Sequence, residues 1–302
     1  MGLIRLGLDL GGTKMEIAAL DAQDRFLLRE RIATPRSYDA SIRAIVELTH
    51  AAATRLAISP RLGVAIPGSV NPATGLVRNA NSTWLNARPL AQDLAAALGA
   101  PVRLANDANC FALSEAIDGA GAGANTVFGA ILGTGCGGGV VIGGRLVQGA
   151  NGIAGEWGHT PLPWMTDEEF PGVACWCGRR GCLETFISGT GLARDHRQVS
   201  GRDWMAEEID AAAQRGDALA QAALTRHCAR LARALAVIAD VLDPDVIVLG
   251  GGLSNLPHLY ADLPRLIASD AFCDAYDVSV RPAHHGDSSG VRGAARLWER
   301  ET

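Results

Sequence analysis

Three cysteines and one histidine have the types and spacing of a zinc site. The cysteines form a Cys-x-Cys-x4-Cys run in which Gly178 and Gly181 suit a turn around a metal, and the candidate ligands are Cys175, Cys177, Cys182 and His159. Structural zinc sites are tetrahedral with nitrogen and sulfur ligands, so this set leaves no open catalytic position. The alternative is a group of reduced structural thiols beside a core histidine. We expect a structural Zn²⁺.

Side chains with the fixed donors and acceptors of a polyol site lie beside Gly-rich turns, and they are Asn81, Asn106, Glu156, His159 and Glu184. A metal that joins the loop after Cys175 to the segment of His159 would bring Glu156 and Glu184 together. The alternative is a set of solvated loop residues, which the zinc clamp disfavours. We expect a site for a small polar ligand.

Asp107 follows a short apolar run, 102–105, and precedes a helix expected to begin near Ala108. A carboxylate there is placed to act as a general base. Phosphoryl transfer needs little covalent help from a protein beyond positioning, charge neutralisation and an acceptor for the proton of the attacking hydroxyl. The alternative role for Asp107 is a helix N-cap, and the local sequence leaves the two roles evenly matched.

Gly-rich turns recur at points where backbone N–H groups could approach a phosphate. Neither Asp9-Leu-Gly-Gly-Thr-Lys14 nor Leu132-Gly-Thr-Gly135 matches a P-loop or a dinucleotide fingerprint, and a single such turn would be read as a tight hairpin. Asp9 is also placed to hold a hydrated Mg²⁺. The expected nucleotide-binding residues are Asp9, Gly11, Gly12, Thr13, Lys14, Gly133, Thr134, Gly135, Gly250, Gly251 and Gly252.

The elements that must carry these residues form two similar modules. Strands expected at 3–10, 15–20 and 25–33 make a β-meander, and strands at 126–132, 140–142 and 145–147 repeat it. A module used twice predicts a duplicated α/β architecture with a ligand cleft between the halves. We place the smaller domain at 1–120 with a C-terminal helix at about 289–302, and the larger domain at 121–288.

Further periodic segments supply the layers around these strands. Helical spacing of apolar residues predicts helices at 41–56 and 218–242, the second of which ends at Asp243-Pro244. Buried strands are expected at 62–66 and at 246–249, where the chain runs into Gly250.

Composition narrows the classes of partner. The chain has 302 residues and a net charge of −5, which disfavours a nucleic-acid partner held by bulk electrostatics. Seven cysteines without a secretory leader disfavour a disulfide-built fold and favour the cytoplasm. No apolar run approaches the length of a membrane span, so no membrane partner is expected.

Five motifs in this order resemble the ROK family of sugar kinases and repressors along almost the whole chain: Asp9-Leu-Gly-Gly-Thr-Lys14, Ala105-Asn-Asp-Ala-Asn109, Gly133-Thr-Gly135, Gly155-Glu-Trp-Gly-His159 and Cys175-Trp-Cys-Gly-Arg-Arg-Gly-Cys182-Leu-Glu184. The resemblance implies a two-domain hexokinase/actin-like (ribonuclease H-like) fold, ATP and Mg²⁺ in the interdomain cleft, Asp107 as base, a bound zinc ion and a homodimer. The implied sugar contacts are Asn81, Asn106, Asp107, Glu156, His159 and Glu184.

Within that family, the segments 79–86 and 156–164 resemble bacterial fructokinases with mannokinase side activity. The resemblance therefore implies an ATP-dependent hexose 6-kinase acting on fructose, with mannose and glucose as further acceptors. The alternative is an N-acetylglucosamine, N-acetylmannosamine or glucose kinase. A sugar-responsive repressor is a distant alternative, because the first phosphate turn begins at Asp9 and leaves no room before it for a helix-turn-helix.

Overall fold

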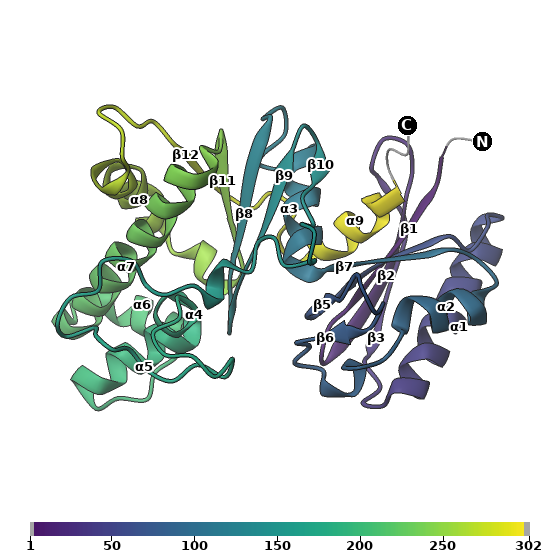
Figure 1. Ribbon diagram of the computed structural model, residues 1–302, viewed down its shortest axis with the longest axis horizontal. Helices are drawn as coiled ribbons and strands as arrows, with labels where there is room; N and C mark the ends of the chain where they lie inside the picture. The colour runs from purple at the N-terminus through teal and green to yellow at the C-terminus, as the bar shows by residue number, and fades with distance from the viewer. Residues whose placement is uncertain (1–2, 299–302) are drawn as a thin grey trace.

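The computed structural model describes residues 3–298 and contains two five-stranded sheets (Figure 1). The first sheet has the order β3-β2-β1-β4-β7. Its first three strands in the chain form an antiparallel meander, and β4 and β7 add to β1 in parallel. The strands are β1 (Arg5–Leu10), β2 (Lys14–Leu20), β3 (Phe26–Ala33), β4 (Leu62–Ile66) and β7 (Val102–Asn106).

The second sheet repeats this design, with the order β10-β9-β8-β11-β12. An antiparallel meander again leads, and two parallel strands follow on the same side of it. The strands are β8 (Thr126–Leu132), β9 (Cys136–Ile142), β10 (Arg145–Leu146), β11 (Val246–Gly250) and β12 (Ser279–Pro282). The predicted duplicated α/β fold with two meander modules is therefore confirmed.

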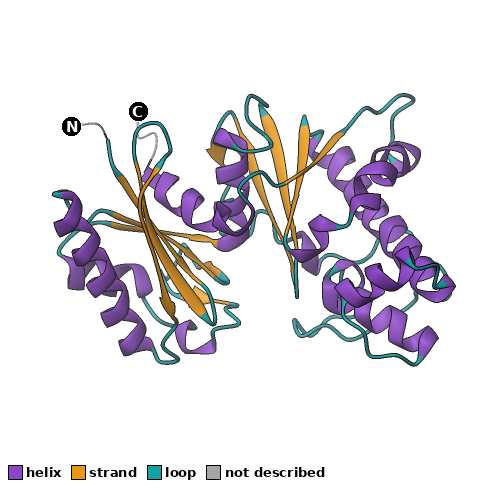
Figure 2. Cartoon of the chain, turned by 180° about the vertical axis from the view of Figure 1, so that it is seen from behind, coloured by secondary structure: helices purple, strands orange, loops and turns teal. Residues whose placement is uncertain are grey.

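Helices cover the outer sides of both sheets (Figure 2). The first sheet carries α1 (Tyr38–Leu56) and α2 (Leu90–Leu98), with a small two-stranded sheet of β5 (Ser69–Val70) and β6 (Val77–Arg78) nearby. The second half contains α4 (Glu184–Ile187), α5 (Gly189–Ser200), α6 (Ala206–Gln214), α7 (Ala218–Leu242) and α8 (Pro257–Asp270). Within residues 3–298, no helix is both long and apolar enough to cross a membrane.

Two helices lie side by side between the sheets: α3 (Asp107–Asp118) and α9 (Ser289–Ala295) (Figure 1). α9 packs on β1 and β4 of the first sheet, and α3 packs mainly on β8 and β9 of the second. Close approach is possible because Gly293 has no side chain, since a Cβ there would overlap the carbonyl oxygen of Cys110. α3 thus lies against the second sheet, although the sequence analysis assigns it to the first domain; the domain boundaries themselves stay a prediction.

Two elements differ from their expected form, and the expected start of one of them was wrong. β9 begins at Cys136, where a turn was expected to continue as far as Gly139. These glycines form a strand because its neighbours come too close for side chains: a Cβ on Gly138 would meet the ring of Trp157, and one on Gly139 would meet the backbone of α3. The expected C-terminal helix is α9 followed by a 3₁₀ turn, Arg296–Trp298, and its residues 299–302 lie outside the described part of the chain.

Glu115 holds together the two connections between the halves. Its side chain is fully buried near the end of α3. One carboxylate oxygen accepts hydrogen bonds from the backbone N–H groups of Ala120 and His284, both at 2.9 Å. The other accepts from the N–H of His285 at 3.0 Å and the hydroxyl of Ser289 at 2.8 Å. The carboxylate thus joins the chain leaving the first half to the chain returning to it.

Replacing Glu115 with glutamine is expected to lower the free energy of unfolding by about 1–3 kcal/mol, because an amide NH₂ at either oxygen position would face a backbone N–H donor. Urea denaturation of the two proteins measures this difference. Asp245→Asn is a matched control, because that exposed carboxylate also accepts from two backbone N–H groups, those of Asn125 and Thr126. Equal losses in the two variants would contradict the role given to Glu115.

Candidate functional site

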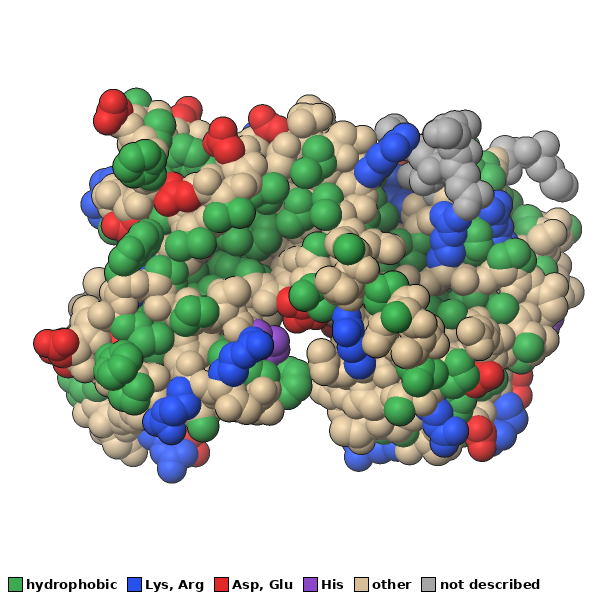
Figure 3. Space-filling model, viewed as in Figure 1, with side chains coloured by type: hydrophobic (Ala, Val, Ile, Leu, Met, Phe, Trp, Pro, Cys, Tyr) green, Lys and Arg blue, Asp and Glu red, His purple; other side chains and the backbone are tan. Residues whose placement is uncertain are grey.

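A cavity of about 490 Å³ lies between the two halves of the molecule. Figure 3 shows the cleft between them, with acidic side chains at its inner end and a histidine on one wall. The lining combines residues from both halves, and it includes every residue expected to contact a sugar together with the second phosphate turn: Asn81, Asn106, Asp107, Gly133, Thr134, Gly135, Glu156, His159 and Glu184. The cavity thus brings polyol-binding and phosphate-binding chemistry together.

The structure separates the two roles that the sequence left open for Asp107. Asn106 is the N-cap of α3, and its side-chain oxygen accepts from the N–H groups of Ala108 at 2.9 Å and Asn109 at 3.2 Å. The amide of Asn106 also donates to the carbonyl of Gly68 at 2.9 Å. Asp107 is the first residue of the helix and is exposed to the cavity. The capping role therefore belongs to Asn106, and Asp107 is available for chemistry.

The surroundings of Asp107 favour its protonated form. Solvent reaches the carboxyl through the cavity, but protein encloses its other sides, and this desolvation raises the pKa of Asp107. The N–H of Ala108, 2.8 Å from the carboxylate, opposes the shift, whereas the charge of Glu156 adds to it. A carboxylate with a raised pKa is a better proton acceptor than an ordinary aspartate at neutral pH.

A second carboxylate, that of Asp9 in β1, lies near enough to Asp107 for the two charges to interact. Desolvation, followed by the negative charges of Asp107 and Glu16, raises the pKa of Asp9 to about 7. Gly290 of α9 packs closely against the Asp9 carboxylate, and a Cβ at that position would lie only 2.6 Å from it. A concentration of carboxylates that repel one another suits a divalent cation with oxygen ligands, so these residues fit the Mg²⁺ expected at Asp9.

The Gly-rich turns lie at different distances from the cavity. The turn Gly133–Gly135 lines it, and Gly251 packs behind that turn at a φ of 81°, where a Cβ would lie 2.5 Å from the carbonyl oxygen of Leu132. The first turn lies outside the lining and beside Ser82, whose hydroxyl would be 3.5 Å from a Cβ on Gly12. The nucleotide-binding roles of all three turns stay predictions.

The sequence analysis missed a second Gly-Thr-Gly segment, Gly189-Thr190-Gly191, which forms the first turn of helix α5. The N–H of Gly189 donates to the carbonyl of Gly133 at 2.7 Å, and the hydroxyl of Thr190 donates to the carbonyl of Thr134 at 2.9 Å. Thr190 also lines the cavity. The signal was present, because this turn repeats the Gly-Thr-Gly sequence of the turn that it supports.

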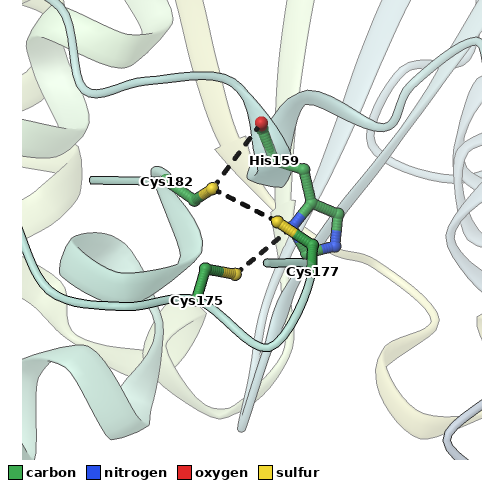
Figure 4. A group of neighbouring side chains, drawn as sticks. All are labelled: His159, Cys175, Cys177 and Cys182. Atoms are coloured by element: carbon green, nitrogen blue, oxygen red, sulfur yellow. Dashed lines mark hydrogen bonds between the residues drawn. The ribbon is translucent and has the colours of Figure 1, made fainter. Parts of the chain in front are cut away.

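The candidate zinc ligands converge on one point (Figure 4). One donor atom from each of the four residues lies within 4.8 Å of all the others. The Sγ of Cys175 is 3.6 Å from the Nδ1 of His159, and the Sγ of Cys177 is 3.6 Å from that of Cys182. Four zinc ligands at about 2.0–2.3 Å from a tetrahedral ion require similar separations, so these residues fit a structural Zn²⁺.

His159 and Glu184 connect this cluster to the cavity. His159 turns Nδ1 toward the cysteines and its second ring nitrogen away from them (Figure 4). One oxygen of Glu184 accepts from the N–H of Cys136 at 3.0 Å, and the other accepts from the indole N–H of Trp176 at 2.7 Å. Trp176 lies between two cysteines of the cluster and lines the cavity. The loop 175–184, called the metal loop because it carries three candidate zinc ligands, thus orients part of the polar wall.

Comparisons with known proteins agree with this geometry. A sequence profile of the ROK family matches residues 5–301. The chain is 40% identical over 301 residues to the N-acetyl-D-glucosamine kinase of Pasteurella multocida. The alignment covers 98% of this chain and 99% of that enzyme. It is also 41% identical over 296 residues to the enzyme of the same name from Photobacterium profundum, covering 96% of this chain and 98% of that one.

Solved structures show the same architecture. The ROK hexokinase of Thermus thermophilus superposes with a TM-score of 0.85 at 31% identity and covers 97% of both chains. The ROK family glucokinase of Streptomyces griseus, solved with glucose and AMPPNP, gives a TM-score of 0.77 at 28% identity, covering 98% of this chain and 99% of that one. Each superposition extends over nearly the full length of both proteins, so it includes both sheets.

Proposed function

The chain belongs to the ROK family and is a sugar kinase, and we propose that it transfers the γ-phosphoryl group of ATP to the 6-hydroxyl of N-acetyl-D-glucosamine. The choice of acceptor is supported by the N-acetyl-D-glucosamine kinases that share about two-fifths of its residues over almost the whole chain. The relatives therefore favour N-acetyl-D-glucosamine, the alternative acceptor of the sequence analysis, over fructose.

The proposed mechanism rests on the position of Asp107. Its carboxylate is not needed to cap α3, and it lies in a cavity that is also lined by a Gly-rich turn and by polar side chains. In this mechanism Asp107 accepts the proton of the sugar hydroxyl as its oxygen attacks the γ-phosphorus, and ADP leaves. Asn81, Glu156, His159 and Glu184 hold the remaining polar groups of the sugar, with Asn106 fixing the start of α3. Alignment of the two reactants, rather than covalent help, supplies most of the acceleration.

The cofactors follow from the same site. The Gly-rich turns would bind the phosphates of ATP through backbone N–H groups, with Thr13 and Lys14 as side-chain donors. Asp9 would hold Mg²⁺, whose charge neutralises the phosphates during transfer. The zinc ion would be structural, because its four protein ligands complete the shell. The homodimer implied by the resemblance stays a prediction.

A panel of hexoses with ATP and Mg²⁺ tests the choice of acceptor. N-acetyl-D-glucosamine is expected to give a kcat/KM at least about tenfold above those of glucose, mannose and fructose, because a site that pairs with an amide leaves polar groups unpaired when the amide is missing. N-acetylmannosamine keeps the amide but carries it in the opposite configuration at C2, so its kcat/KM should also be lower. The product should be the 6-phosphate, which phosphorus-coupled NMR identifies. A higher kcat/KM for fructose would reverse the assignment.

A further inference from the structure

Trp176 occupies a junction of three cavities. It lines the sugar cavity, a neighbouring cavity of about 820 Å³ along the loop 71–87, and a third of about 890 Å³ beside the end of α7. Asn79 also lines all three. The two residues come from opposite halves of the molecule, so they flank the route by which the sugar cavity opens into its neighbours.

The indole of Trp176 is held in place although it is exposed. About 66% of the residue is accessible to solvent. Its N–H donates to Glu184 at 2.7 Å, its ring makes an edge contact with His159 at 4.9 Å between centroids, and its neighbours in the chain are Cys175 and Cys177 of the metal cluster. A large apolar ring fixed by polar contacts within a polar cavity is a preformed platform for an apolar group of a ligand.

Asn79 faces this platform from the other half with an unusual backbone. Its φ is 57°, the left-handed region that Asn tolerates better than most residues, and its side chain is exposed. An asparagine amide offers both a donor and an acceptor, which matches the N–H and C=O of another amide. A ligand group that combines an amide with an apolar end would therefore complement the pair Asn79 and Trp176.

We propose that Trp176 determines specificity by packing its indole face on the methyl end of an acylamido substituent of the sugar, with Asn79 pairing with the amide of that substituent. This inference rests on the proposed acceptor, N-acetyl-D-glucosamine. The adjoining cavities leave room beside the ring for a substituent longer than a hydroxyl. A plain hexose lacks the methyl group and the amide, so it would not make either of these contacts.

Two variants separate the ring from its hydrogen bond. Trp176→Ala removes the platform, so kcat/KM for N-acetyl-D-glucosamine is expected to fall about 10–200-fold, the range for losing an apolar pocket contact. The loss for glucose should be clearly smaller, because glucose is affected only through the lost hydrogen bond to Glu184. Trp176→Phe keeps an aromatic face and loses only the N–H bond to Glu184, so it should retain most of the preference. The zinc content of each variant, measured by elemental analysis, shows whether the metal loop is intact.

Fluorescence gives a second measurement that does not depend on turnover. N-acetyl-D-glucosamine added without ATP should change the tryptophan emission of the wild type and of Trp164→Phe, but not that of Trp176→Phe. Trp164 is a matched control because it is also exposed, at 58%, and lies outside the lining of the three cavities. An unchanged preference in Trp176→Ala, or an equal loss for both sugars, would overturn the inference. A wild type inactive on N-acetyl-D-glucosamine would instead refute the proposed acceptor.

Discussion

Replacing Asp107 with asparagine is expected to lower kcat by about 10²–10⁴-fold, the usual contribution of a general base, while the dissociation constant of the sugar changes by only a few-fold. Asparagine has almost the same volume, and its side-chain oxygen can still accept from the N–H of Ala108, which is 2.8 Å from the carboxylate. The helix cap is also unaffected, because Asn106 supplies it. The substitution therefore removes the proton acceptor and little else.

Steady-state kinetics with saturating ATP measure kcat, and titration calorimetry with the sugar alone measures its dissociation constant. Asp9→Asn is the matched comparison, because that carboxylate shares the electrostatic environment of Asp107 but is proposed to hold Mg²⁺. Its main effect should be a higher KM for Mg-ATP. If Asp107→Asn keeps kcat within tenfold of the wild type, Asp107 is not the base.

The activity should depend on pH through Asp107. Desolvation raises the pKa of Asp107, and a base must be deprotonated to accept a proton, so kcat in the wild type should fall as the pH is lowered toward that raised pKa. The contribution of Asp107 to the stability of the fold has the opposite pH dependence. A carboxyl with a raised pKa contributes stability at low pH that is lost as the pH rises through the folded-state pKa.

The parts of the fold that local patterns describe were predictable. The two meanders, α7 and the strand β11 follow from alternating or helical apolar spacing that ends at Gly, Asp or Pro, and α7 has the expected bounds, Ala218–Leu242. The similarity of the two meander patterns also implied the duplication. Local patterns did not reveal which sheet α3 would join. That depends on Gly129 and Gly139, where a Cβ would meet Ala112 and only glycine lets the helix approach.

The residues that line the cavity were predictable to a similar depth. The polar residues expected around a sugar do line one cavity, and the candidate zinc ligands converge beside it. The contacts that each of these residues makes were not predictable. Asn106 caps α3 and donates to the carbonyl of Gly68. Trp176 bonds to Glu184 because it lies between two candidate zinc ligands, and its residue type alone does not indicate this.

Removing zinc is expected to impair sugar binding more than the chemical step. The protein should contain about one zinc ion per chain, and Cys177→Ser should lower kcat/KM for the sugar by about 10–100-fold, the scale seen when the support of a metal site is lost. The physical reason is that His159, Glu184 and Trp176 are oriented by the metal loop, whereas Asp107 stands on α3. KM for the sugar should therefore rise more than kcat falls.

Matched treatments separate the zinc effect from its alternatives. A zinc-selective chelator used in excess Mg²⁺ should reproduce the defect in the wild type, and added zinc should reverse it there but not in Cys177→Ser. Cys273→Ser is the control, because that cysteine is exposed and lies outside the cluster. Freshly purified, active protein without zinc would rule out the metal. In that case the hydrogen bonds of Glu184 to Cys136 and Trp176 would have to hold the polar wall by themselves.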